Sequence, residues 1–250
     1  AETAPNAAPA PAAAKAPARG RGLDMAEMRK AIAAAMAKSK REIPHYYLAT
    51  EIDLSAADAH LAALNAEREP ADRLLPGVLT MKATAQALKR MPQFNGFHGP
   101  DGFTPSDRVH MGTAVAIRGG GLIAPAIHDA DTLSLDALMA ALKDLVARVR
   151  SGGLRSSELS DPTVTVTALG ERGVETVYGV IYPPQVALIG FGKPVRKVVP
   201  VTGPDGRGEA VAIRPRLTAT LAADHRVSDG RAGGLFLAEI DKLLQSPEAL

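Results

Sequence analysis

The segment Asp224-His225-Arg226-Val227-Ser228-Asp229-Gly230 lies where the last predicted strand, Pro215 to Ala223, meets the last predicted helix, Gly230 to Leu244. Junctions of this kind commonly hold functional side chains. His225 is suited to accept a proton near neutral pH, and the carboxylate of Asp229 is placed to fix its surroundings or to pair with an arginine. Asp and Ser at a helix start also serve as caps, so the motif alone leaves both a catalytic and a structural role open.

Upstream of this motif, helical and strand patterns are mixed without strict alternation. Helices are predicted over Asp24 to Glu42, Ser55 to Arg68, Thr80 to Met91 and Leu133 to Arg150. Strands are predicted over His45 to Asp53, Thr163 to Ala168, Val186 to Phe191 and Val195 to Val201, together with a hairpin-like pair, Val109 to Ile117 and Leu122 to Ile127, joined by a turn at Gly119 to Gly121. This mixture predicts an α+β domain around a mixed or antiparallel sheet.

The N-terminus has a different composition from the rest of the chain. Residues 1–18 contain ten Ala and four Pro, which cannot bury a core, so residues 1–22 are predicted to be a flexible linker ahead of one domain over residues 23–250. The chain has 29 Lys plus Arg against 27 Asp plus Glu, and the first 22 residues alone supply that net charge of +2. A neutral body lacks the positive field that a nucleic-acid backbone requires, so nucleic acid is not an expected partner.

Several classes of chemistry are excluded by residues that the sequence lacks. There is no cysteine, which rules out disulfides, Cys-ligated zinc and an enzyme thiol nucleophile. The six histidines show no metal-ligand spacing, and neither a P-loop, a dinucleotide fingerprint nor a Gly-x-Ser-x-Gly elbow occurs, so no metal site is predicted. Apolar runs such as Val186 to Gly192 fall far short of the roughly 18 residues that span a bilayer, and no secretory signal is recognised. We therefore expect a cytoplasmic protein without a membrane partner.

Six segments match one known family in the right order, over about residues 23–250. They resemble the catalytic domain of the dihydrolipoamide acyltransferases of 2-oxo acid dehydrogenase complexes. The matching segments are MRKAIAAAMAKSKREIPHYYL (28–48), ALKRMPQFNGF (87–97), GLIAPAIHDAD (121–131), TVTVTALG (163–170), IYPPQVALIGFG (181–192) and DHRVSDG (224–230). The Ala/Pro-rich start of the chain is similar to the linker that in this family joins the core to lipoyl and subunit-binding domains.

The resemblance implies a fold and a set of catalytic residues. The fold would be a chloramphenicol-acetyltransferase-like two-layer sandwich with a mixed sheet that forms trimers, each active site lying between subunits. His225 would be the general base that takes a proton from the thiol of coenzyme A or dihydrolipoamide. Thr167 occupies the position of the family's oxyanion-binding serine and keeps a hydroxyl, and Asp229 would organise the catalytic loop. Gly121 and Leu122 are weaker candidates for the substrate channel, because the preceding Arg-Gly-Gly departs from the family pattern.

The resemblance also implies partners and leaves alternatives. Coenzyme A would be a substrate, the lipoyl group would be carried on a domain absent from this chain, and no metal would be needed. The partners would be two further copies, with a larger cubic or dodecahedral core left open, and the other dehydrogenase-complex subunits. The acyl group is open between acetyl, succinyl and branched-chain. Two other functions remain: an oligomeric structural core with weak or lost catalysis, and a lipoyl-independent, coenzyme A-dependent acyltransferase.

Overall fold

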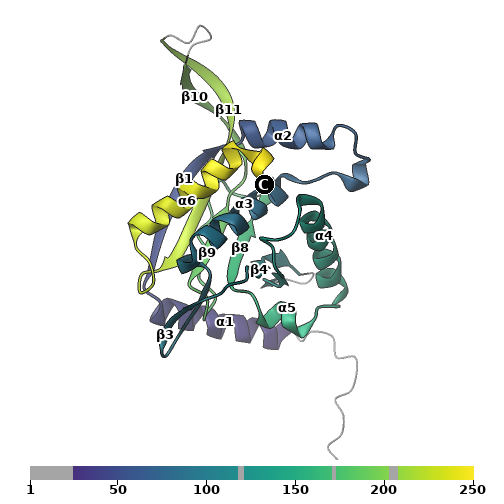
Figure 1. The fold of residues 1–250 in the computed structure, drawn as a ribbon. Coiled ribbons are helices and arrows are strands. Elements are labelled where there is room, and N and C mark those ends of the chain that lie inside the picture. The colour runs from purple at the N-terminus through teal and green to yellow at the C-terminus, as the bar shows by residue number, and fades with distance from the viewer. Residues whose placement is uncertain (1–24, 118–120, 171–172, 203–207) are drawn as a thin grey trace, which may run out of the picture.

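The computed structural model of the chain describes residues 25–117, 121–170, 173–202 and 208–250 (Figure 1). The predicted linker over residues 1–22 lies outside the described residues, as does most of the predicted turn at Gly119 to Gly121. The described part forms a sheet with helices packed over one face, and α1 (Met25–Glu42) runs along the base in the view of Figure 1.

A seven-stranded sheet organises the domain. Six strands follow the order β1-β11-β9-β8-β4-β7, and β10 pairs with one end of the long β11. The β4–β8 and β8–β9 pairs are parallel and the other pairs are antiparallel, which confirms the predicted mixed sheet. The strands are β1 (His45–Asp53), β4 (Met111–Thr113), β7 (Ala126–Ile127), β8 (Val164–Ala168), β9 (Ala187–Phe191), β10 (Val195–Thr202) and β11 (Glu209–Asp224).

Four helices cover the face of the sheet that carries the main core. They are α2 (Ser55–Asn65), α3 (Pro76–Arg90), α4 (Leu135–Ser151) and α6 (Gly230–Gln245), while the short α5 (Ser156–Ser160) lies before β8. Phe94 and Phe236 stack with ring centroids 4.6 Å apart, and both are fully buried with Phe191 and Leu221. Burying each such side chain contributes about 1.5–3 kcal/mol, so this apolar layer holds the helices on the sheet. Short 3₁₀ turns lie at Pro70–Asp72, Pro92–Phe94 and Pro247–Ala249.

Some element boundaries differ from the predicted ones. The strand predicted over Val109 to Ile117 is broken at Ala114, whose backbone N–H turns to the carbonyl of Val166. Its halves belong to two sheets, because β4 pairs with β7 whereas β5 (Val115–Ala116) pairs with β6 (Leu122–Ile123). The hairpin of β2 (Gly96–Gly99) and β3 (Gly102–Pro105) was not predicted.

Two helix ends are also corrected. The third helix begins at Pro76 rather than Thr80, because proline fits the first helical turn, where its missing N–H is not needed. The second helix ends at Asn65 rather than Arg68. The Asn65 side chain donates to the carbonyl of Leu74 and accepts from its N–H, both at 2.9 Å, which fixes the chain reversal after the helix.

The β10–β11 ribbon projects from the body of the domain (Figure 1). The first part of β11, up to Arg216, pairs with β10, and the strand pairs with β1 only from Arg216 onward, so the projecting part of the ribbon is two strands wide. Val198 and Ile213 are cross-strand partners, and Val211 lies two residues along the same face. These three side chains are 69%, 57% and 76% exposed. A two-stranded ribbon with an apolar face is only marginally stable alone in water, so this face is suited to a contact with another molecule.

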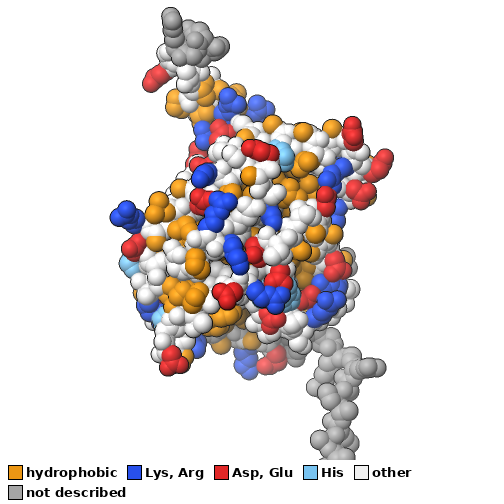
Figure 2. All heavy atoms as spheres, in the orientation of Figure 1, with side chains coloured by type: hydrophobic (Ala, Val, Ile, Leu, Met, Phe, Trp, Pro, Cys, Tyr) orange, Lys and Arg blue, Asp and Glu red, His pale blue; other side chains and the backbone are white. Residues whose placement is uncertain are grey.

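Two further expectations concern nucleic-acid and membrane partners. Figure 2 shows acidic and basic side chains interspersed over the visible face rather than a field of one sign. Within the described residues, none of the helices combines the length and the hydropathy needed to cross a bilayer.

Candidate active site

The loop after β11 is built around a buried carboxylate. Asp224 is fully buried at the end of the strand and pairs with the guanidinium of Arg226, whose Nε and Nη2 donate to its two oxygens at 2.9 and 2.6 Å. Its Oδ1 also accepts from the backbone N–H of Arg226, and its carbonyl accepts from the N–H groups of Val227 and Ser228. These bonds satisfy the buried charge and fold the chain back on itself, which presents the next side chain, His225, at the surface.

His225 is exposed at this junction of strand and helix. Its backbone N–H donates to the carbonyl of Pro44 at 2.9 Å, which ties the loop to the start of β1. Its ring packs edge-to-face against Tyr46, with centroids 5.1 Å apart and an interplanar angle of 66°. Among the described residues, the two ring nitrogens make no hydrogen bond, so they are available to a substrate.

Asp229 lies four residues after His225 and begins the last helix. It is the N-cap of α6, where its side chain accepts from the N–H of Ala232 at 2.8 Å. It therefore orients the helix start and with it the end of the loop. The arginine of the motif pairs with Asp224 and not with Asp229, because Asp224 is buried beside it and the Asp229 oxygen is used by the cap.

Thr167 lies at the carboxyl end of β8, far from His225 in the same chain. It is in register with Gly190 of β9, which is in register with Thr220 of β11. His225 follows Thr220 by five residues, so the two candidates are separated by roughly 17 Å along the sheet at about 3.4 Å per residue. One chain does not bring Thr167 and His225 together. A site that uses both requires a second copy.

The remaining candidates lie apart from the loop. Gly121 adopts a φ of 121°, which favours glycine, and Leu122 is 54% exposed at the start of β6. His45 is held structurally, because its Nδ1 bonds the carbonyl of Ile43 and its Nε2 accepts from the N–H of Ile181. Burial lowers the pKa of His45, which favours this neutral form. The described residues contain no group of three or more His, Asp or Glu side chains arranged to hold a metal ion.

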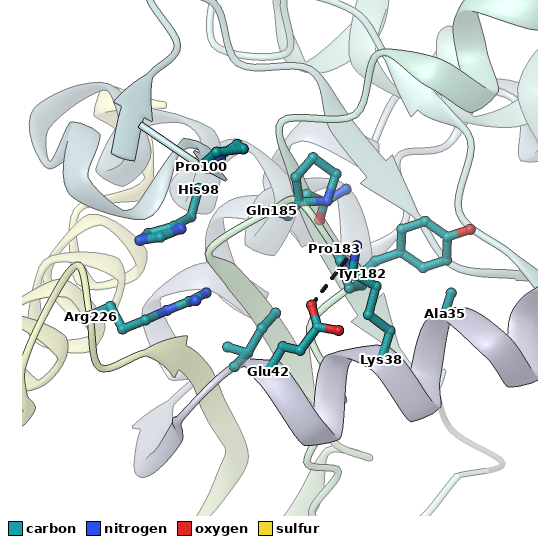
Figure 3. Close-up of a pocket in the computed structure, with 12 residues that line it drawn as sticks. Ala35, Lys38, Glu42, His98, Pro100, Tyr182, Pro183, Gln185 and Arg226 are labelled. Carbon is teal, nitrogen blue, oxygen red and sulfur yellow. Dashed lines mark ion pairs between the residues drawn. The ribbon is translucent and has the colours of Figure 1, made fainter. Parts of the chain in front are cut away.

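A cavity of about 750 Å³ adjoins the loop on the side of Arg226 (Figure 3). Lys38 and Glu42 of α1 form an ion pair at 3.9 Å on one wall, and His98 and Arg226 lie on the other. Tyr182, Pro183, Pro184 and Gln185 also line the cavity. The sequence prediction missed this cavity, because its walls come from four separate segments. It also missed Tyr46. The only sequence signal for this residue was an aromatic side chain in the strand predicted over His45 to Asp53.

Comparison with known structures defines the class of protein first. A chloramphenicol acetyltransferase with 14% sequence identity superposes with a TM-score of 0.54, covering 84% of this chain and 94% of its own. The dihydrolipoamide acetyltransferase of Azotobacter vinelandii superposes more closely, with a TM-score of 0.81 and 27% identity over 95% of this chain and 99% of the other. The same values hold for the cubic core of a pyruvate dehydrogenase multienzyme complex. The domain therefore has the predicted chloramphenicol-acetyltransferase-like acyltransferase fold.

The sequence then gives the family. Residues 18–250 match the family model described as 2-oxoacid dehydrogenases acyltransferase (catalytic domain), and the chain belongs to that family. The dihydrolipoyllysine-residue acetyltransferase component of the mitochondrial pyruvate dehydrogenase complex of Schizosaccharomyces pombe is 34% identical over 225 residues. That match covers 90% of this chain and 46% of the relative, so the chain spans about half the length of the curated relatives it matches.

Proposed function

We propose that this domain transfers an acyl group between dihydrolipoamide and coenzyme A, as a component of a 2-oxo acid dehydrogenase complex. The observation that carries the proposal is His225, exposed at the strand–helix junction with both ring nitrogens available and with Asp229 four residues later. In the Azotobacter vinelandii enzyme, a serine, a histidine and an asparagine that follows the histidine by four residues have roles in the catalytic mechanism. His225 and Asp229 have the same spacing.

The proposed reaction is a direct transfer from one thiol to another. The neutral imidazole of His225 accepts the proton of the attacking thiol, whose ordinary pKa is about 8.5, and the thiolate forms as it attacks the thioester carbonyl. The carbonyl oxygen gains negative charge in the tetrahedral intermediate. Collapse of this intermediate expels the second thiolate, which takes the proton back from the imidazolium of His225. Both thiols belong to substrates, which is compatible with a chain that has no cysteine.

The developing oxyanion needs a hydrogen-bond donor, and we assign that role to the hydroxyl of Thr167. The serine named in the Azotobacter enzyme offers the same hydroxyl without the methyl group. The separation of Thr167 and His225 within one chain favours a site in which a neighbouring copy supplies the threonine. We therefore propose a trimer with three shared sites, and the resemblance to a cubic core extends the proposal to a larger assembly.

Several finer points belong to the same proposal. The acyl group is proposed to be acetyl, because the relatives named above are acetyltransferases. Coenzyme A would be a substrate and Gly121 and Leu122 would lie in its channel, and the lipoyl group would arrive on another domain or chain. Residues 1–22 would be the tether to further domains and partner enzymes. A cytoplasmic location stays a prediction, and the Schizosaccharomyces relative is mitochondrial.

Thr167 supports a second candidate function, a structural core that assembles partner enzymes with little catalysis of its own. A β-branched side chain has restricted χ1 freedom, and a misdirected hydroxyl would leave the oxyanion unpaired. A lipoyl-independent acyltransferase is the third candidate, supported by the shared fold alone.

One experiment separates the three candidates. The purified protein is incubated with acetyl-, succinyl- or isobutyryl-coenzyme A and free dihydrolipoamide, and the thioester product is followed by mass spectrometry. We expect acetyl transfer, and we expect His225→Ala to lower the rate by at least about 10²-fold because general-base catalysis contributes that much. His60→Ala, a change on α2, is the matched control and should keep the wild-type rate.

The other outcomes assign the other functions. A folded, oligomeric protein that is inactive with every donor would support the structural core. In a parallel assay with a small alcohol or amine as the acceptor, transfer to that acceptor but not to dihydrolipoamide would support the lipoyl-independent enzyme. Full activity in His225→Ala would remove His225 from the mechanism.

A further inference from the structure

We propose that Tyr46 is the positioning residue of His225: its ring holds the imidazole, and its hydroxyl, bonded to Ser228, holds the loop that carries it. This inference rests on the proposed acyl transfer, since it assigns how the general base is kept in place. It concerns a strand residue that precedes His225 by 179 positions.

The first support is the pair of contacts that Tyr46 makes with the loop. Its ring lies edge-to-face against the ring of His225, and its hydroxyl lies 2.8 Å from Oγ of Ser228. One rigid side chain therefore touches the loop at His225 and again three residues later. Edge-to-face aromatic pairs are favoured by about 0.5–1.5 kcal/mol beyond the area they bury, so the contact restricts the imidazole.

The second support is that no hydrogen bond to another described residue restrains the imidazole. The loop is anchored at its two ends, by the buried Asp224 and by the helix cap of Asp229. The backbone N–H of His225 is bound to Pro44, but its ring nitrogens are unbonded. The orientation of the ring thus depends on packing, and Tyr46 is the aromatic neighbour that packs on it.

The third support is that Tyr46 is itself held in place by the helix α6. The helix α6 crosses β1 at Gly233, where an added Cβ would lie 3.0 Å from Cε2 of Tyr46 and 2.7 Å from Cδ1 of Leu48. Glycine at this position lets the helix backbone approach the strand and close over the tyrosine ring. Tyr46 also packs against the main hydrophobic core. The position of the tyrosine ring is therefore fixed by the helix and the core.

The ionisation of Tyr46 agrees with this role. Burial raises the pKa of its phenol above the ordinary value of 10, with the bond to Ser228 acting in the opposite direction. The hydroxyl stays protonated at neutral pH and remains a hydrogen-bond partner of Ser228 rather than a charge beside the general base.

The proposal is tested with variants of the full chain that remove the two contacts separately. Tyr46→Phe keeps the ring and loses the hydroxyl, and it should lower kcat about three- to tenfold, as expected for one hydrogen bond. Tyr46→Leu removes the aromatic ring, and it should lower kcat on the order of 10²-fold, because misplacement of a catalytic group by about 1 Å has that effect. The KM for coenzyme A should change by less than about twofold, since the loss lies in the transition state.

A double-mutant cycle isolates the bond between the two hydroxyls. Ser228→Ala should cost as much as Tyr46→Phe, and the double variant should cost no more than either one, because all three remove the same bond. Tyr47→Phe is the matched control: the neighbouring tyrosine has its hydroxyl bonded to Lys40 and contacts Tyr178, away from the loop. It should keep the wild-type kcat.

Crystal structures of the wild-type protein and of Tyr46→Leu give a readout that does not depend on activity. The imidazole of His225 should occupy one rotamer in the wild type and more than one in the variant. An inactive wild type with this change in rotamers would overturn the proposed function but keep the positioning role. A single unchanged rotamer, additive losses in the cycle, or a loss confined to KM would overturn the positioning role.

Discussion

Thr167 is the residue on which the catalytic proposal depends most. It lies near the carboxyl end of β8 and is half-buried in the single chain. Thr167→Ser should preserve or raise kcat, because it keeps the donor and frees χ1. Thr167→Val keeps the shape and removes the donor, and it should lower kcat by about 10²- to 10³-fold. Steady-state transfer assays on the two variants decide this, and equal rates for Val and Thr would show that the hydroxyl is not the oxyanion donor.

At the residue scale, the sequence predicted what a local motif encodes. The placement of His225 and Asp229 at a strand–helix junction followed from seven consecutive residues, because capping and proton-transfer preferences act locally. The pairing of Asp224 with Arg226 did not follow, because it depends on the burial of the Asp224 carboxylate, which only the folded strand provides. Tyr46 was missed for the same reason, since its contact with the motif exists only after β1 and β11 pair.

Two histidines at the edge of the sheet make the stability of the fold depend on pH. His110 precedes β4 and His128 follows β7, with rings 4.7 Å apart. Asp129 donates its N–H to Nδ1 of His110 and is ion-paired with Arg108, and the carboxylate of Asp161 accepts from Nε2 of His128 at 3.1 Å. Burial, and next the proximity of His128, lower the pKa of His110 below 6.5, against the opposing pull of Asp129.

The sign of the pH dependence follows from that lowered pKa. Below about pH 6.5, His110 binds a proton more readily in the unfolded chain than in the folded chain. Its contribution to the free energy of unfolding is therefore fully present above that pH and is lost as the pH falls through the lowered pKa of the folded state. The pKa of His45 is also lowered, so it gives the same sign of pH dependence. The Tm of the wild type should fall between about pH 7.5 and pH 5, and His110→Gln should reduce that fall. Calorimetry at the two pH values measures it, and an undiminished fall in the variant would exclude His110 as a source.

The β10–β11 ribbon carries a prediction about assembly. Ile213 lies on the exposed apolar face with Val198 and Val211, whereas Arg214 points to the opposite face. If this face packs on a neighbouring copy, Ile213→Glu buries a charge in that contact and should dissociate the oligomer while the far-UV circular dichroism stays unchanged. Sedimentation velocity measures the mass, with Arg214→Gln as the control that stays assembled. An assembled Ile213→Glu protein would place the contact elsewhere.

At the element scale, the regular helices and the buried strands were predictable because their periodicity reflects one packing face. The apolar stretch of β9 is buried along its whole length, and α4 and α6 follow their predicted spans closely. The last strand was predicted too short, over Pro215 to Ala223, whereas β11 begins at Glu209 and passes through the proline next to the residue where its pairing changes from β10 to β1. A proline is tolerated there because the ladder changes partners at that point.

The whole molecule is where the two halves of the proposed site must meet. His225 lies just beyond the end of β11, and Thr167 lies roughly 17 Å back along the sheet at about 3.4 Å per residue. A single chain therefore offers a base without an oxyanion donor at one position and a donor without a base at the other. A cyclic assembly resolves this, because each interface joins the base of one copy to the donor of the next.

Mixing two inactive variants tests this arrangement directly. His225→Ala and Thr167→Val are co-expressed so that they assemble at random into mixed oligomers. In a shared site, the base comes from a Thr167→Val chain and the donor from a His225→Ala chain, so about one interface in four regains both groups, and about a quarter of the wild-type rate should return. A site within one chain can regain nothing, because every chain carries one lesion. Mixing the two proteins after separate assembly is the control and should restore nothing until the subunits exchange, whereas a co-expressed mixture no more active than its parents would place both groups in one subunit or remove Thr167 from the site.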